Sequence, residues 1–218
     1  MPDLDGPRWG PKAGGAPRQL VVLCHGVGAD GHDLIDLAPG WGPALPHALF
    51  VSPDAPESYD QAPMGRQWFS IADRTPAKMA AGVAAAAAAL SRFIDAEFAR
   101  LALPADAYAL MGFSQGAMTV LYTGLRRTVP PRAILAYSGA RLAPERLGEA
   151  TGRPPILLVH GEADPTVPVE RSRLAETALR DADFEVETLY IPRLAHGIDP
   201  TGLAFGALFL QRAFADDA

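Results

Sequence analysis

The sequence Gly-Phe-Ser-Gln-Gly at residues 112–116 constrains the fold of this chain more than any other segment. It follows an apolar run at 108–111, which is typical of a buried strand, and it opens a segment, 115 to about 126, with a helical pattern. A G-x-S-x-G sequence between a strand and a helix is typical of a nucleophilic serine on a very tight turn. The turn leaves no room for side chains two residues before and after the serine, so both positions are glycine. We therefore expect Ser114 to be a catalytic nucleophile.

Short apolar runs alternate with helical patterns along the rest of the chain. Strands are expected at 20–24, 48–52, 108–111, 133–137, 156–160 and 185–191, and helices at 76–101, 115–126, 169–181 and 200–214. This alternation predicts βαβ units, and hence the α/β class with a mostly parallel central sheet and helices on both faces. We expect residues 1–17 to form a flexible N-terminal segment and residues 18–218 to form a single domain.

Composition and charge exclude several classes of function. Hydrophobic residues make up 49% and charged residues 20% of the chain, as in ordinary soluble globular proteins. The net charge of -6 argues against nucleic-acid binding. The single cysteine, Cys24, excludes an internal disulfide, and without a Cys/His cluster we expect no metal site. The apolar stretch 83–90 is too short to cross a bilayer and residues 1–17 lack a secretory signal, so we expect a cytoplasmic protein without stable membrane insertion.

A serine nucleophile needs a histidine base, and two histidines follow Ser114 in the sequence. His160 ends an expected strand and is interpreted as a structural residue that hydrogen-bonds the loop after it. His196 follows the last expected strand, so its ring can reach over the serine. We therefore expect His196 to be the base, in the chain order serine, acid, histidine that accompanies this kind of turn.

The acid that orients the histidine is expected to be Asp164. It lies just past the C-terminal end of the strand at 156–160, where functional groups of open α/β sheets gather. Glu162, on the same loop, is the competing candidate. Asp199 is better explained as the N-cap of the final helix.

Two backbone N–H groups are expected to stabilise the negative charge that develops on the substrate oxygen. One belongs to Gln115, at the N-terminus of the helix after the serine, where the helix dipole helps. The other is assigned to Val27, in the glycine-containing loop that follows the first buried strand.

The substrate pocket is expected beside the long segment 53–74, which shows no clear element of its own. Its large apolar residues Trp68 and Phe69 are predicted to border the acyl group, with core packing as the alternative. Leu142 and Val167 are further candidates for substrate binding.

Five segments of the chain together resemble the phospholipase/carboxylesterase family of α/β-hydrolases, which includes acyl-protein thioesterases. These segments run in the family's order between about residues 18 and 214, and they comprise residues 23–31, 68–71, 112–116, 160–164 with 167–168, and 195–197. Val27, where leucine is more common, and Cys24, where a larger apolar residue is common, depart from the family pattern. A backbone donor does not depend on its side chain, so neither difference affects the expected triad.

The resemblance implies the α/β-hydrolase fold and a serine carboxylesterase that cleaves short- to medium-chain esters through an acyl-enzyme, without a cofactor. It supports Ser114, Asp164 and His196 as the triad, and Val27 and Gln115 as the oxyanion donors. Hydrolysis of acyl thioesters or lysophospholipids on the same machinery is the alternative. A non-catalytic binding module would be expected to lack part of this machinery. The expected partner is a small-molecule ester or thioester, and a homodimer stays open.

Overall fold

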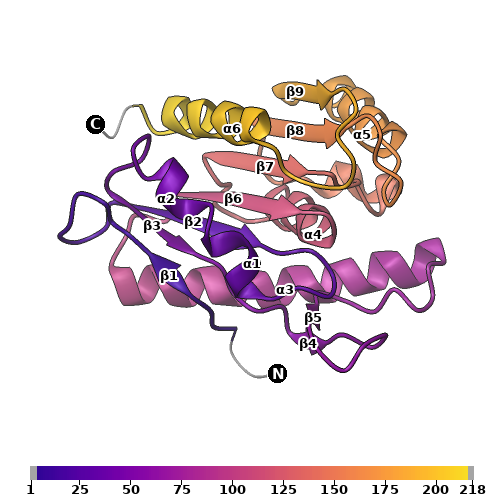
Figure 1. Ribbon diagram of the computed structural model, residues 1–218, viewed down its shortest axis with the longest axis horizontal. Helices are drawn as coiled ribbons and strands as arrows, with labels where there is room; N and C mark the ends of the chain where they lie inside the picture. Colours follow the sequence, from indigo (N-terminus) through magenta and orange to yellow (C-terminus); the bar gives the residue numbers. More distant parts are fainter. Residues whose placement is uncertain (1–3, 216–218) are drawn as a thin grey trace.

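The computed structural model describes residues 4–215, which are organised around a seven-stranded sheet (Figure 1). The strand order is β1-β3-β2-β6-β7-β8-β9. The strands are β1 (Arg8–Trp9), β2 (Gln19–Cys24), β3 (Ala48–Val51), β6 (Tyr108–Phe113), β7 (Ala133–Tyr137), β8 (Ile156–Gly161) and β9 (Val186–Ile191). Neighbouring strands from β3 to β9 pair in parallel, and β1 pairs with β3 antiparallel. The predicted α/β class with a mostly parallel sheet is confirmed.

Helices cover both faces of the sheet, as predicted. They are α1 (Gly31–Ile35), α2 (Ala38–Trp41), α3 (Pro76–Leu101), α4 (Gln115–Gly124), α5 (Glu170–Asp181) and α6 (Pro200–Ala213), with the 3-10 helix η1 at Pro144–Glu149. Successive residues of a strand point to opposite faces, so Leu20, Val22 and Cys24 of β2 pack in the core under α3, α4 and α5. Val21 and Leu23 pack in the second core, under α1, α2 and α6. Strands buried on both faces explain the continuous apolar runs in the sequence.

The long helix α3 combines length and apolar composition to a degree that would allow it to cross a membrane. In the structure its apolar residues pack in the protein core: Val83, Leu90 and Ile94 are fully buried against the sheet. The helix begins at Pro76, which suits the first helical position because its missing N–H has no intrahelical partner there. Its preceding residue, Thr75, has the extended backbone of an N-cap, but its side chain makes no capping hydrogen bond.

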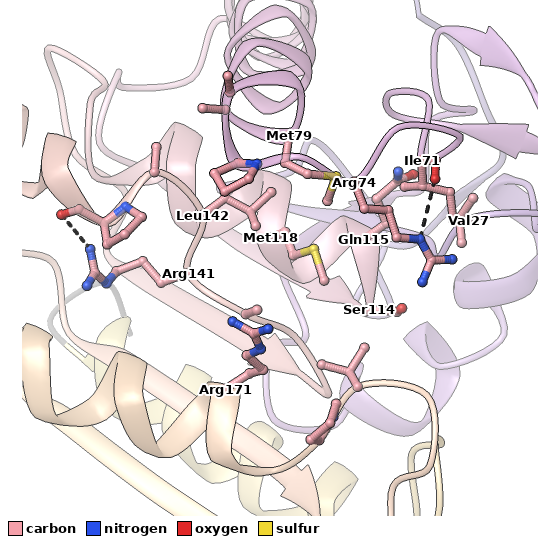
Figure 2. Close-up of a pocket in the computed structure, with 18 of the residues that line it drawn as sticks. Val27, Ile71, Arg74, Met79, Ser114, Gln115, Met118, Arg141, Leu142 and Arg171 are labelled. Atoms are coloured by element: carbon pink, nitrogen blue, oxygen red, sulfur yellow. Dashed lines mark hydrogen bonds between the residues drawn. The ribbon is translucent and has the colours of Figure 1, made fainter.

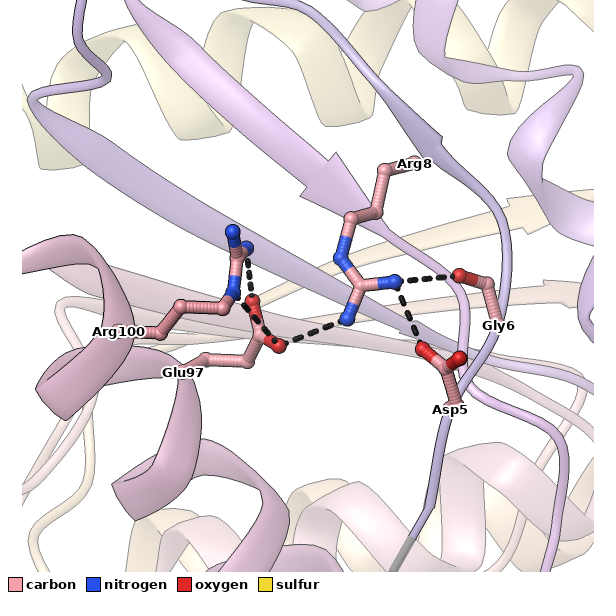
Figure 3. Close-up of polar contacts among 5 residues, drawn as sticks. All are labelled: Asp5, Gly6, Arg8, Glu97 and Arg100. Carbon is pink, nitrogen blue, oxygen red and sulfur yellow. Dashed lines mark hydrogen bonds and ion pairs between the residues drawn. The ribbon is translucent and has the colours of Figure 1, made fainter.

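Part of the N-terminal segment that we expect to be flexible contacts the rest of the protein, whereas residues 12–16 are exposed. Arg8 and Trp9 pair with Val51 and Phe50 of β3. The Arg8 guanidinium donates a 2.8 Å hydrogen bond to the buried Glu97 carboxylate on α3 (Figure 3). A strand of two residues leaves no periodic signal, and its ionic partner lies 89 positions away, so composition alone suggested a free segment. Residues 1–3 lie outside the described residues.

The Glu97 carboxylate is held by two arginines. Arg100 donates to it at 2.6 Å from the next turn of α3, and Arg8 approaches from the N-terminal segment while also binding Asp5 at 2.7 Å. Burial acts to raise the pKa of Glu97, but the hydrogen bonds from Arg100 and Arg8 outweigh it, and the pKa is lowered. The charged form of Glu97 therefore fastens the start of the chain to α3.

The segment 53–74 also contains structure that the sequence did not predict. A short antiparallel hairpin joins β4 (Glu57–Ser58) to β5 (Arg66–Gln67). The hairpin is hydrogen-bonded to the glycine-containing loop after β2, since the Gly28 N–H donates to the Arg66 carbonyl oxygen at 2.8 Å. The hairpin therefore supports the loop that carries Val27.

Candidate active site

Ser114 occupies the sharp turn between β6 and α4. Its backbone has φ 54° and ψ −115°, a conformation that residues other than glycine rarely adopt. A Cβ atom on Gly116 would lie 1.8 Å from the Cys24 carbonyl oxygen, and one on Gly112 would lie 2.4 Å from the Gly116 backbone. These two glycines therefore have the steric reason that the sequence predicted, and the turn holds Ser114 in a strained geometry.

Asp164 and His196 are brought together by the loops that follow β8 and β9. The His196 Nδ1 lies 2.7 Å from the Asp164 Oδ2, and the backbone N–H groups of Thr166 and Val167 donate to Oδ1 at 2.8 and 2.9 Å. Burial acts to raise the pKa of Asp164, but the hydrogen bonds from His196, Val167 and Thr166 outweigh it and lower the pKa. A charged Asp164 can thus fix the orientation of the His196 ring.

The other two candidates on these loops, His160 and Glu162, have different surroundings. His160 is fully buried, with its Nδ1 2.6 Å from the Ser172 hydroxyl and its Nε2 2.8 Å from the Val167 carbonyl oxygen and 3.2 Å from the Asp164 Oδ2. It thus supports the acid loop, as the sequence suggested. The Glu162 carboxylate is partly exposed and pairs with Arg173 at 2.7 Å.

His196 approaches the serine turn through a ring contact. Its imidazole centroid lies 4.8 Å from that of Phe113, the residue before Ser114. Within residues 4–215, no hydrogen bond joins the Ser114 hydroxyl to His196. Such bonds are often long in active sites without substrate and shorten when it binds.

The two predicted oxyanion donors line the same cavity as Ser114 (Figure 2). The loop of Val27 crosses close to the serine turn, since a Cβ atom on Gly26 would lie 3.4 Å from the Ser114 Cβ. In the described part of the chain, neither the Val27 nor the Gln115 backbone N–H donates to another protein group. Both are therefore available to a substrate oxygen, and Gln115 adds the positive end of the α4 dipole.

The side chain of Gln115 has a separate role that the sequence did not indicate. Its Oε1 accepts from the Trp68 N–H at 2.8 Å, and its Nε2 donates to the Phe69 carbonyl oxygen at 2.7 Å. The Trp68 indole N–H donates in turn to the His25 carbonyl oxygen at 2.9 Å. The residue after the serine, the segment 68–69 and the loop of Val27 are thus joined in one hydrogen-bonded network.

The His25 ring completes this network in a defined tautomer. Its Nε2 accepts from the Ala55 N–H at 3.0 Å, so the proton is on Nδ1, which donates to the Gly26 carbonyl oxygen at 2.7 Å. Burial lowers the pKa of His25, which keeps the ring neutral and preserves this arrangement.

The cavity beside Ser114 has a volume of about 720 Å³, and its lining includes Leu142 and Val167, the two further candidates for substrate binding. Trp68 and Phe69 do not line it: they are 1% and 2% exposed and belong to the core beneath α3. Their burial supports the alternative of core packing over the prediction that they border the acyl group, and the Gln115 side chain is hydrogen-bonded to the backbone of both residues. Among residues 4–215, no group of three His, Cys, Asp or Glu side chains is arranged to hold a metal ion.

Sequence reasoning missed several residues of the cavity wall. These are two methionines, Met79 and Met118, and three arginines, Arg74, Arg141 and Arg171. Their separation along the sequence hides their proximity, which depends on how α3, α4 and α5 pack around the C-terminal ends of the strands.

The sheet order, the covering helices and the serine turn define the α/β-hydrolase fold. The crystal structure of esterase PE8 superposes with a TM-score of 0.91 and 38% identity, covering 97% of this chain and 99% of that chain. Residues 12–213 match the family model of phospholipases and carboxylesterases. The chain therefore belongs to the phospholipase/carboxylesterase family of serine hydrolases.

Two curated relatives show the range of this similarity. Esterase YpfH of Escherichia coli strain K12 is 31% identical over 189 residues, covering 86% of this chain and 80% of that protein. Acyl-protein thioesterase 1 of Mycosarcoma maydis is 30% identical over 236 residues, covering 93% of this chain and 94% of that protein. The family therefore includes enzymes named for esters and for thioesters.

Proposed function

We propose that the protein is a serine carboxylesterase in which Ser114, His196 and Asp164 form the catalytic triad. The observation that carries this proposal is that Ser114, on its strained turn, lines the same cavity as Val27 and Gln115, whose backbone N–H groups have no protein acceptor among the described residues. The His196–Asp164 pair beside Phe113 supplies the base and the group that orients it.

The reaction follows from this arrangement. His196 accepts the hydroxyl proton as the Ser114 Oγ attacks the ester carbonyl carbon, and the resulting oxyanion accepts hydrogen bonds from Val27 and Gln115. The imidazolium then protonates the leaving alcohol, which departs and leaves an acyl-serine. A water molecule, deprotonated by His196, attacks the acyl carbon, and the acid is released with regeneration of Ser114.

Acyl thioesters are the second candidate class, favoured by the thioesterase relative that matches nearly the full length of both chains. A thioester passes through the same tetrahedral intermediate and needs the same donors. The two classes differ in the leaving group, so matched oxyester and thioester substrates with one acyl chain would separate them by their kcat/KM values.

The proposal is tested by replacing the nucleophile. Ser114→Ala should lower kcat for 4-nitrophenyl esters by a factor on the order of 10⁴ to 10⁶, as for other triads. It should also abolish labelling by a fluorophosphonate probe, which reacts with activated serines.

Ser91→Ala provides the matched control, because Ser91 lies on α3 away from the cavity. This variant should keep both activity and labelling. Labelling of Ser114→Ala at the rate of the unmodified protein would contradict the proposal.

A further inference from the structure

The cavity beside Ser114 is strongly cationic as well as apolar. Three arginines line it, Arg74, Arg141 and Arg171, against one acidic residue, Glu145. The chain as a whole has a net charge of -6, so this concentration of positive charge opposes the average of the protein.

The three guanidiniums have few partners within the described residues. Arg141 donates from Nη1 to the Pro144 carbonyl oxygen at 3.0 Å, but its Nε is buried and has no hydrogen-bond partner. Arg74 makes a single contact, of 3.4 Å, to the Ile71 carbonyl oxygen. Arg171 has neither a hydrogen bond from its guanidinium nor an ion pair in residues 4–215.

Some arginines elsewhere in the fold are paired: Arg8, Arg127 and Arg212 each contact a carboxylate oxygen at 2.6–2.8 Å. Exposed arginines such as Arg92 have no ion pair within residues 4–215, and Arg74 and Arg171 are also exposed, so Arg141, which is partly buried, is the unusual member of the three. A guanidinium that is partly removed from water without an anion is unfavourable, and burial lowers the pKa of Arg141 for this reason. Arg141 remains charged, because arginine does not lose its proton in proteins, so its unpaired N–H groups are available to an anion.

The arginines are spread along the cavity rather than gathered at one point. Figure 2 shows Arg74 near Ser114 and Val27, Arg171 reaching toward the middle of the cavity, and Arg141 at the end away from Ser114. Leu142 and Met118 lie between the two ends. A ligand that starts at Ser114 therefore meets an apolar section before it meets Arg141.

We propose that the cavity selects esters whose bound portion carries an anionic group, a carboxylate or a phosphate, separated from the reacting carbonyl by a short apolar chain. This inference rests on the proposed esterase function. The guanidinium fork matches both anions and can donate two parallel hydrogen bonds to either. Arg171 and Arg141 would hold the anion, and the apolar section would hold the chain between.

Two matched pairs of substrates test the proposal and separate the two anions. The first pair is mono-4-nitrophenyl adipate, with a free carboxylate, and 4-nitrophenyl methyl adipate, which has the same chain without the charge. The second pair is 4-acetoxybutyl phosphate and its neutral dimethyl triester, followed by acetate release. We expect the anionic member of at least one pair to be preferred about tenfold or more in kcat/KM, since charge-assisted hydrogen bonds are the strong ones. The carboxylate lies on the acyl side of the first ester and the phosphate on the alcohol side of the second, so the preferred pair shows which combination of anion and position the cavity accepts.

Substitutions then locate the preference. Arg171→Gln and Arg141→Gln should each reduce the ratio of anionic to neutral kcat/KM, and Glu145→Gln should raise it by removing a repulsive charge. Arg92→Gln, which changes an exposed arginine of α3 outside the cavity, should leave the ratio unchanged. Because Arg171 is exposed, its variant should fold even if the partly buried Arg141 does not tolerate replacement.

The outcomes separate this proposal from the esterase function. Ser114-dependent hydrolysis of the neutral esters with no preference in either pair would overturn the anion proposal alone. If no ester is hydrolysed, calorimetry still tests the anion proposal. Adipate should then bind more tightly than 1,6-hexanediol, and Arg171→Gln should remove this difference in affinity. Equal binding of adipate and the diol would overturn the proposal.

Discussion

At the scale of single residues, the two carboxylates of the loop after β8 have different environments. Asp164 is buried and accepts hydrogen bonds from one imidazole and two backbone N–H groups. Glu162, two residues earlier, faces solvent and pairs with Arg173. Position just past the strand end favoured Asp164, and the number of donors that surround each carboxylate supports the same prediction.

Asp164→Asn should therefore impair catalysis far more than Glu162→Gln. The neutral amide cannot hold the imidazole in the required tautomer or stabilise its charged form, so kcat should fall by a factor on the order of 10⁴. Glu162→Gln loses only an exposed ion pair, which is worth about 0–1 kcal/mol, and should keep its activity. Steady-state kinetics on one nitrophenyl ester compares the two, and equal losses would mean that the acid is wrongly assigned.

At the scale of elements, the sequence predicted well those parts whose pattern is local. Strands β2, β6, β7 and β8 are continuous apolar runs because helices cover them on both faces, and the serine turn has its own glycine requirement. The direction in which a large apolar side chain points is not local. Trp68 and Phe69 therefore looked like a pocket wall, whereas in the structure they are buried in the core and their backbone is hydrogen-bonded to Gln115, almost fifty positions away.

The same limit applies to the arginines of the cavity. Arg74 precedes α3, Arg141 follows β7 and Arg171 lies in the first turn of α5. Each reads in the sequence as an ordinary exposed charge, because nothing near it along the chain marks a ligand. Only the packing of the connecting segments around the C-terminal strand ends brings the three to one cavity.

The position of Trp68 gives a test at this scale. Trp68→Phe should lower the free energy of unfolding by about 1–3 kcal/mol, through lost packing and the lost hydrogen bond to the His25 carbonyl, and should leave the preferred acyl length unchanged. Leu142→Ala, in the cavity wall, should shift the preference toward longer chains. Urea unfolding and a series of nitrophenyl esters measure both effects, and a shift in acyl preference for Trp68→Phe alone would contradict this assignment.

At the scale of the whole molecule, the ion-pair cluster of Arg8, Glu97 and Arg100 joins the start of the chain to the far half of α3. Glu97 is 4% exposed, so its charge depends on both arginines. The cluster therefore attaches the chain at Asp5 and Arg8 to α3.

Arg8→Met should lower the free energy of unfolding by about 1.5–3 kcal/mol, the usual contribution of a hydrogen bond to a charged group. Because the pKa of Glu97 is lowered in the folded state, the ion pair stabilises the protein above the unfolded pKa of about 4.3, and this contribution is lost as pH falls through the lower, folded pKa. The difference between the two proteins should thus be largest near neutral pH and shrink below about pH 4. Arg92→Met is the control, and a difference that does not vary with pH would contradict an ionic role for Arg8.

The position of β1 has a further consequence, for association between molecules. The outer strand of a sheet offers unpaired backbone groups on which a strand of another chain can dock, and such docking leads to aggregates. β1 covers this flank of β3, whose four residues are all apolar and buried. At the opposite flank, β9 carries Glu187, paired with Arg212 at 2.6 Å, and charge of this kind discourages an incoming strand. Removal of the first ten residues should therefore expose the edge of β3 and allow neighbouring copies of the chain to pair with it and aggregate.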